Sequence, residues 1–273
     1  KALLYHYGEQ GFNKIIIDWI LPLFLPFVFN ILNDARKRNI NHLFFFSRDG
    51  YTIYILCKEA MKCLQFTDIQ IDYIHISRMI IYPSSLNSLT TNEIERYFNI
   101  EKRLMSVQSI LEQFNLGKYL NLIRDIDEQK LTDKLLPPKE KRKLLEIIIN
   151  NNAFRKAALK AIKRDRTLLL QYFEQEGVLK NINSNAFVDI SGTRMSQYAI
   201  NKILTEEGYG KLFGYYLCNI GDIPSIKETG NYYSMVSGVW GDQGLCTPLV
   251  EDVFSITDQG RTEEYVECNG KIK

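Results

Sequence analysis

The sequence lacks the short motifs that identify several common classes of enzyme and binding protein. It contains no Gly-x-Gly-x-x-Gly stretch and no Walker-type phosphate loop, so neither a dinucleotide-binding fold nor a P-loop fold is indicated. Its three histidines form no Ser-His-Asp pattern. Its five cysteines are widely spaced and include no Cys-x-x-Cys pair, which argues against a disulfide framework or a zinc site. We therefore expect reduced thiols in a cytoplasmic protein.

A strong excess of one charge is also missing. The chain has 34 basic and 32 acidic side chains, a net charge of +2, which gives no electrostatic case for nucleic acid as a partner. With 273 residues, of which 45% are apolar, it is long enough to bury a substantial core. Because it begins at Lys1 and stops at Lys273 without a helix cap or turn, we expect it to be part of a longer polypeptide.

One apolar run approaches the length of a membrane span. Residues 15–32 read IIIDWILPLFLPFVFNIL, but Asp18, Asn30 and two prolines interrupt them, and charged residues follow at once. A charged group inside a bilayer is expensive. We therefore expect a buried or partner-facing helix rather than a transmembrane span, and a cytoplasmic protein that is at most peripheral to a membrane.

Three short apolar runs predict a parallel sheet. They cover residues 43–46, 71–76 and 186–190, and each is followed by small or polar residues and then by helical periodicity. The predicted helices cover about 51–64, a start after Ser77-Arg78, and about 195–204, and a fourth strand is predicted at 212–217. Strand-loop-helix units of this kind build a mainly parallel sheet covered on both faces. The predicted fold class is therefore α/β, with a three-layer, Rossmann-like sheet.

The predicted domain organisation follows from a long helical region between the second and third strand-loop-helix units. Helical spacing runs through residues 92–98, 107–114 and 153–176, and Pro137-Pro138 breaks this region. A further helix is predicted from Thr247-Pro248. The predicted division is an N-terminal helical segment packing on the core (1–40), an α/β core (41–90 and 181–273), and a helical insertion or cap (91–180).

The polar residues after the three predicted strands form the candidate site. In open α/β sheets, ligands bind where the carboxyl ends of strands lead into helices. Asp49 and Asp189 are the candidates for a general base or for ligands of a Mg²⁺ cofactor. Arginines and hydroxyl groups suit a phosphorylated ligand. The candidate binding residues are Ser47, Arg48, Gly50, Ser77, Arg78, Ser191, Gly192, Thr193 and Arg194.

Each of these loops also has a purely structural interpretation. Ser47 or Asp49 would simply cap the helix that follows, and Asp49-Gly50 is a common turn. The run Ser191-Gly192-Thr193 would cap the next helix in the same way. Three such loops at one predicted edge favour a ligand site over three separate caps.

The order of these motifs resembles that of the haloacid-dehalogenase phosphatases. Their first strand ends in Asp-x-Asp-Gly, with the first aspartate as the nucleophile, whereas this chain has Ser47-Arg48-Asp49-Gly50. A serine without a neighbouring base is a poor substitute for that carboxylate. The resemblance therefore implies a haloacid-dehalogenase-like fold more than it implies the phosphatase reaction.

A closer resemblance covers most of the chain. Residues 43–51 (LFFFSRDGY) and residues 73–78 (YIHISR) are similar to the second domain of bacterial polysaccharide-locus proteins whose first domain is a haloacid-dehalogenase-type phosphatase. Residues 188–193 (VDISGT) match its "VDIGWxGT" loop in part, since the Gly-Trp step is missing and the loop is shorter. Residues 248–251 (PLVE) match its "P-x-x-E" helix, which adds Glu251 to the binding residues.

This resemblance implies a function. Some members of that family resemble, as whole proteins, dual-domain ribofuranosyltransferases, in which the second domain transfers phosphoribosyl from 5-phosphoribosyl-1-diphosphate to a glycan. The chain would then bind a phosphorylated sugar donor and a glycan acceptor, and its partner would be an N-terminal phosphatase domain outside this sequence. Two alternatives stay open. The first is a phosphatase-like hydrolase that uses Asp49 without the usual nucleophile, and the second is a non-catalytic module that docks a glycan or a partner domain.

Overall fold

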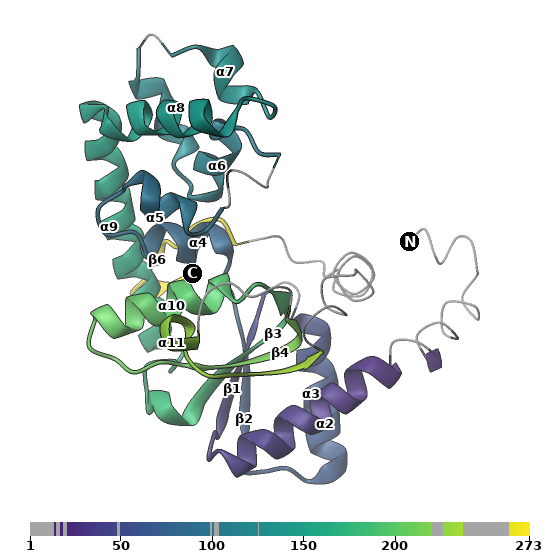
Figure 1. The fold of residues 1–273 in the computed structure, drawn as a ribbon. Helices are drawn as coiled ribbons and strands as arrows, with labels where there is room; N and C mark the ends of the chain where they lie inside the picture. The colour runs from purple at the N-terminus through teal and green to yellow at the C-terminus, as the bar shows by residue number, and fades with distance from the viewer. Residues whose placement is uncertain are drawn as a thin grey trace.

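A computed structural model describes residues 14, 17–18, 21–47, 50–98, 100, 104–124, 126–219, 226–236 and 262–273. It confirms the predicted α/β class, because a parallel sheet lies between two layers of helices (Figure 1). The spatial order of its strands is β2-β1-β3-β4-β5, and all neighbouring pairs are parallel. The strands are β1 (His42–Phe46), β2 (Gln70–Ile74), β3 (Asn185–Gly192), β4 (Phe213–Asn219) and β5 (Tyr232–Val236).

Helices cover both faces of this sheet. On β1, Leu43 and Phe45 pack into one hydrophobic cluster together with α2 and α3, whereas Phe44 and Phe46 pack into a second cluster with α4 and α10. Successive side chains of a strand point to opposite faces, so a strand covered on both faces has to be continuously apolar. The covering helices are α2 (Leu21–Lys37), α3 (Tyr51–Leu64), α4 (Arg78–Ser84) and α10 (Met195–Glu206).

The two connections that flank β1 run over opposite faces of the sheet. Helix α3 leads from β1 to β2 on one face, and the connection from β2 to β3 covers the other face. Strand β1 therefore has β2 on one side and β3 on the other. This reversal of strand order is a topological switch point, where open α/β sheets bind their ligands.

The connection from β2 to β3 is mostly helical. We call α5 to α9 the helical lobe, and Figure 1 shows it beyond the end of the sheet at which α4 begins. Buried residues of the lobe, such as Phe114 and Phe154, belong to the same cluster as Phe187 of the sheet. The division of the chain into three regions stays a prediction. The elements of the lobe are α5 (Thr91–Glu95), α6 (Val107–Gln113), the 3-10 helix η2 (Gly117–Leu122), α7 (Glu128–Thr132), α8 (Pro138–Asn150) and α9 (Asn152–Gln175).

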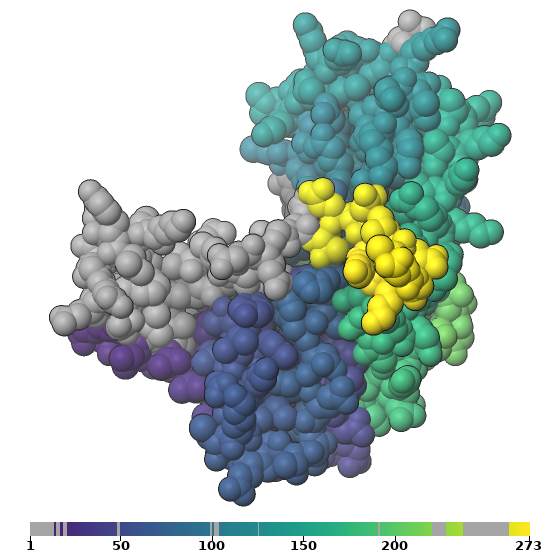
Figure 2. Space-filling view, turned by 180° about the vertical axis from the view of Figure 1, so that it is seen from behind, coloured from purple at the N-terminus to yellow at the C-terminus, as the bar shows by residue number. Residues whose placement is uncertain are grey.

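The last twelve residues (262–273), which we call the C-terminal strap, contain a small hairpin of β6 (Glu267–Cys268) and β7 (Lys271–Ile272). The side chain of Gln175 on α9 donates to the carbonyl of Ile272 at 3.1 Å and accepts from its N–H at 2.9 Å. The rings of Tyr172 and Tyr265 stack at 4.6 Å. Figure 2 shows the strap between the helical lobe and the α/β core.

The predicted elements agree with the structure, with small shifts. Strand β2 ends at Ile74, earlier than predicted, because the N–H of His75 donates to the hydroxyl of Tyr172 at 2.8 Å instead of continuing the ladder. Strand β5, the hairpin and the short elements η3 (Ile182–Ser184) and α11 (Ile226–Thr229) were not predicted. The helix predicted from Thr247 lies outside the described residues.

Helix α2 corresponds to the second half of the long apolar run. Six of its residues are buried against the sheet, and Pro26 lies inside it. Within the described ranges, no helix combines the length and the apolar character needed to cross a bilayer. The expectation of a buried helix is therefore confirmed for this part of the run.

Buried amides attach α10 to the amino ends of β4 and β5. Asn201 donates to the carbonyls of Leu212 at 2.9 Å and Thr229 at 2.5 Å, and it accepts from the N–H of Leu212 at 2.8 Å. We expect Asn201→Ala to lower the free energy of unfolding by about 3 kcal/mol, since it leaves several buried polar groups unpaired. Urea denaturation measures this loss. Asn152→Ala, at an exposed position on α9, is the control, and an equal effect of both variants would contradict the prediction.

Candidate functional site

The carboxyl edge of the sheet gathers the predicted loops on neighbouring strands. β1 pairs with β3 from His42 opposite Asn185 onward, so the loop after Phe46 lies next to the carboxyl end of β3. Gly192 at the end of β3 is in register with Asn219 at the end of β4. The first and third predicted loops therefore flank the switch point. Arg48 and Asp49 of the first loop lie outside the described residues.

Ser47 extends the pairing of β1 with β2. Its hydroxyl donates to the carbonyl of Ile76 and accepts from the N–H of Ile76, both at 3.0 Å. Its only O–H is thus committed to the backbone of the neighbouring segment. The residue that caps α3 is Gly50 and not Ser47. A serine held in this way supports the edge of the sheet and is not poised to act as a nucleophile.

Gly50 is required by a close approach of the backbone. Its N–H donates to the carbonyl of Phe46 at 2.9 Å, and a Cβ at this position would lie 2.6 Å from that same oxygen. Its backbone is in the ordinary right-handed region, so sterics and not backbone conformation select glycine here. The tight turn lets α3 begin directly at the carboxyl end of β1.

The second loop, after β2, is held by the C-terminal strap. The hydroxyl of Ser77 donates to the carbonyl of Thr262, and the hydroxyl of Tyr265 donates to the carbonyl of His75 at 2.6 Å. Ser77 is the residue before α4, but its side chain makes no capping hydrogen bond to that helix. Arg78 is exposed in the first turn of α4. The interpretation of Ser47 as the cap of the following helix is therefore wrong, since Gly50 holds that position.

Asp189, the one of the two predicted aspartates that the structure describes, lies within β3, three residues before its end. The Asp189 carboxylate is half-buried and accepts from the N–H of Ile190 at 2.9 Å. Complete burial raises the pKa of the Tyr216 hydroxyl, Asp189 raises it further, and the guanidinium of Arg194 lowers it. Asp189 and Arg194 are thus both close enough to act on one tyrosine. Gly192 and Thr193 are half-buried, and the side chain of Ser191 lies outside the described part.

Arg194 has the most unusual environment of the predicted binding residues. It is only 4% exposed, and its backbone is left-handed, with φ 61° and ψ 13°, although it is not glycine. Its guanidinium lies 4.3 Å from the ring centroid of Tyr232. Among the described residues, neither Nε nor Nη1 has a hydrogen-bond partner. A buried charge with unpaired donors and a strained backbone is costly, and such costs concentrate at functional sites.

Two further residues at this site were missed by sequence reasoning. Asn219, at the end of β4, is buried, and its Oδ1 has no hydrogen-bond partner in the described ranges. A polar residue that ends the apolar run 212–218 could have signalled it. Tyr232, which stacks with Arg194, belongs to the strand that was not predicted.

The predicted Mg²⁺ site is described only in part. No group of three or more His, Cys, Asp or Glu side chains gathers in the described ranges. Mg²⁺ is commonly held by one or two carboxylates together with substrate phosphates, so Asp189 fits such a role. The predicted partner ligand Asp49 and the predicted binding residue Glu251 lie outside the described residues.

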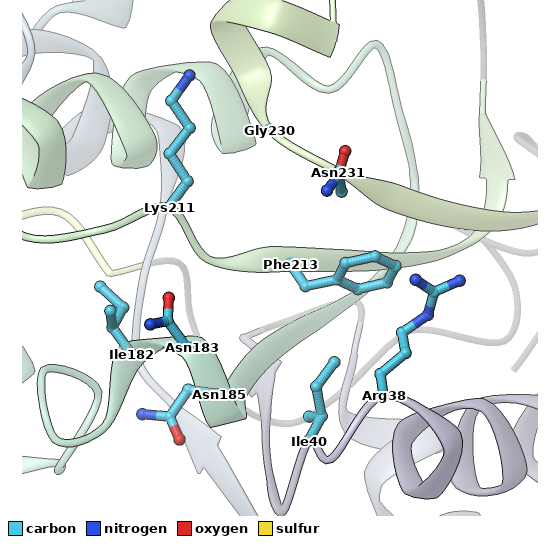
Figure 3. A pocket seen from close by; sticks show the side chains of 9 residues that line it. All are labelled: Arg38, Ile40, Ile182, Asn183, Asn185, Lys211, Phe213, Gly230 and Asn231. Carbon is cyan, nitrogen blue, oxygen red and sulfur yellow. The ribbon is translucent and has the colours of Figure 1, made fainter.

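A depression at the opposite edge of the sheet has no predicted site residue in its lining. It has a volume of about 600 Å³ and lies at the amino ends of the strands (Figure 3). Its lining includes Arg38, Lys211, Phe213 and Asn231.

Comparisons with protein-family models and with curated protein sequences find no match to the chain.

The contact at Gly50 gives a stability prediction. We expect Gly50→Ala to lower the free energy of unfolding by about 2 kcal/mol, because the new methyl group clashes with the backbone of β1. Chemical denaturation measures the change. Gly117→Ala is the matched control, since its Cβ would meet the side chain of Glu112 rather than backbone. Equal stability of Gly50→Ala and the wild type would show that the turn relaxes freely.

Proposed function

We propose that the chain binds a phosphorylated sugar at the switch point between β1 and β3 and transfers its glycosyl group to a glycan. The proposed donor is 5-phosphoribosyl-1-diphosphate, as the resemblance of the motifs implies. The observation that carries the proposal is the buried guanidinium of Arg194, whose Nε and Nη1 have no hydrogen-bond partner within the described chain. A phosphate oxygen is the kind of acceptor that these donors lack.

The chemistry of arginine favours a phosphate over a neutral ligand. The guanidinium is planar and always charged, and its N–H groups match phosphate oxygens in a two-pronged arrangement. Arg194 is also the N-cap residue directly before α10, and the first N–H groups of a helix favour an anion. One phosphate at this position would accept hydrogen bonds from the Arg194 side chain and from the first backbone N–H groups of α10.

The proposed transfer needs a base and a stabilised leaving group. The acceptor hydroxyl oxygen would form a bond to C1 of the donor, the bond from C1 to the diphosphate would break, and the acceptor proton would pass to a carboxylate. We assign that role to Asp189, with Asp49 as the alternative base. Mg²⁺, held by whichever of these two carboxylates does not act as the base, would neutralise the charge of the diphosphate. Gly192 and Thr193 would add donors at the end of β3.

The phosphatase alternative is weakened by Ser47, whose hydroxyl is engaged on both sides by Ile76. Hydroxyl groups that are engaged within the fold also support the non-catalytic alternative. Ser47 and Ser77 both use their O–H groups inside the fold, which leaves fewer polar groups for catalysis. Binding and turnover therefore have to be measured separately.

Calorimetric titration with 5-phosphoribosyl-1-diphosphate, with and without Mg²⁺, tests the binding step. We expect saturable binding that Arg194→Gln weakens at least about tenfold, because a charge-assisted hydrogen bond is lost. Arg164→Gln, at an exposed arginine that pairs with Asp165 on α9, is the matched control and should bind as the wild type. Undiminished binding by folded Arg194→Gln would remove the observation on which the proposal depends.

Release of diphosphate in the presence of oligosaccharide acceptors tests the transfer step. We expect Asp189→Asn to retain donor binding and to lose most of the turnover, since the amide cannot accept the proton. Tight binding by the wild type without turnover on any acceptor would instead identify a non-catalytic module. Phosphate release from simple phosphomonoesters would favour the hydrolase.

A further inference from the structure

The depression at the amino edge of the sheet is built from four separate parts of the fold. It is lined by Ile40 before β1, Ile182 and Asn183 before β3, Lys211 before β4, and Asn231 before β5. Parallel strands place these segments together at the end opposite the candidate site. Its volume of about 600 Å³ lies within the range of small-molecule sites.

The lining of this depression is basic and rich in amides. Arg38 and Lys211 contribute cations, three asparagines contribute amides, and no acidic side chain is among the residues that line it. Figure 3 shows the ring of Phe213 between Lys211 on one side and the guanidinium of Arg38 on the other. Such a surface favours an anion that also carries hydrogen-bonding groups.

Arg38 is held in place by the core. Its Nε donates to Asp34 at 2.5 Å, and Asp34 also accepts from the buried Tyr215 hydroxyl at 3.0 Å. The guanidinium lies 4.6 Å from the ring centroid of Phe213. These contacts fix the position of an otherwise flexible side chain before a ligand arrives, which reduces the entropy lost on binding.

Two of the three asparagines are free to contact a ligand. Asn185 is committed to the fold, since its Nδ2 donates to the carbonyls of Val178 at 2.9 Å and Lys180 at 2.6 Å. In the described structure, the side-chain amides of Asn183 and Asn231 have no such bonds. An amide both donates and accepts, so the pair is suited to hydroxyl groups.

We infer that this depression is a binding site for an anionic monosaccharide, with a phosphate or a carboxylate as its charged group. Arg38 and Lys211 take the anion, Asn183 and Asn231 bind ring hydroxyls, and Phe213 packs against the carbon-bound face of the sugar. This site lies at the other end of the strands from Arg194. The inference therefore does not rest on the proposed transferase function.

The experiment follows the side-chain amide signals of the ¹⁵N-labelled full chain by nuclear magnetic resonance. The probes are ribose 5-phosphate, glucuronate, uncharged ribose and inorganic phosphate. We expect ribose 5-phosphate or glucuronate, or both, to shift the signals of Asn183 and Asn231 saturably, and ribose alone to shift them far less. A response to only one of the two acids identifies the charged group as phosphate or carboxylate.

Matched variants separate this site from the carboxyl edge. Asn231→Ala and Arg38→Gln should each weaken the binding about tenfold, whereas Arg194→Gln and the exposed control Asn152→Ala should leave it unchanged. Asn183 reports on the ligand even where Asn231 is replaced. The inference is overturned by an absence of saturable shifts, by equal shifts with inorganic phosphate alone, or by binding that only Arg194→Gln weakens.

Discussion

The parallel pairing of β1 with β3 is the constraint on which the arrangement of the candidate site depends. The connection from β1 to β2 runs over one face of the sheet, and the connection from β2 to β3 runs over the other. The loops that follow β1 and β3, separated by more than a hundred residues, therefore start from adjacent strands. Burial on both faces holds this pair together, and the stacked rings of Phe46 and Phe187 at 4.7 Å lie just below the edge. Without this pairing, Arg194 would have no spatial relation to the loop after β1.

The polar residues at this edge divide into two kinds. Ser47 and Ser77 use their hydroxyl groups to fasten the ends of β1 and β2 to neighbouring backbone. Arg194 does the opposite, because it is buried without enough partners in the described chain and has a left-handed backbone. Its guanidinium stacks on Tyr232, and both Arg194 and Asp189 act on the hydroxyl of Tyr216. A helix start alone does not require an arginine here, whereas the proposed phosphate ligand would pair its N–H groups.

The sequence was sufficient to predict the elements whose pattern is local. The run 43–46, helix α3 and helix α10 were predicted closely, because apolar strands and amphipathic helices are visible within a few residues. Strand β5 is as long as β1 and β2 but was missed, because the residues that flank it show no clear pattern. The engagement of Ser47 by Ile76 and the burial of Arg194 could not be predicted, since both depend on segments that are distant in the sequence. The depression at the amino edge could not be predicted either, because it forms only when the starts of four strands come together.

The helical lobe is mechanically connected to the candidate site through the end of β2. The N–H of His75 donates to Tyr172 of α9, and the carbonyl of His75 accepts from Tyr265 of the C-terminal strap. The strap in turn binds α9 through Gln175 and the second loop through Ser77. A shift of α9 relative to the sheet must therefore break these bonds or carry the second loop with it. Because that loop lies at the same edge as Arg194, the position of the lobe and the shape of the site are linked by the fold itself.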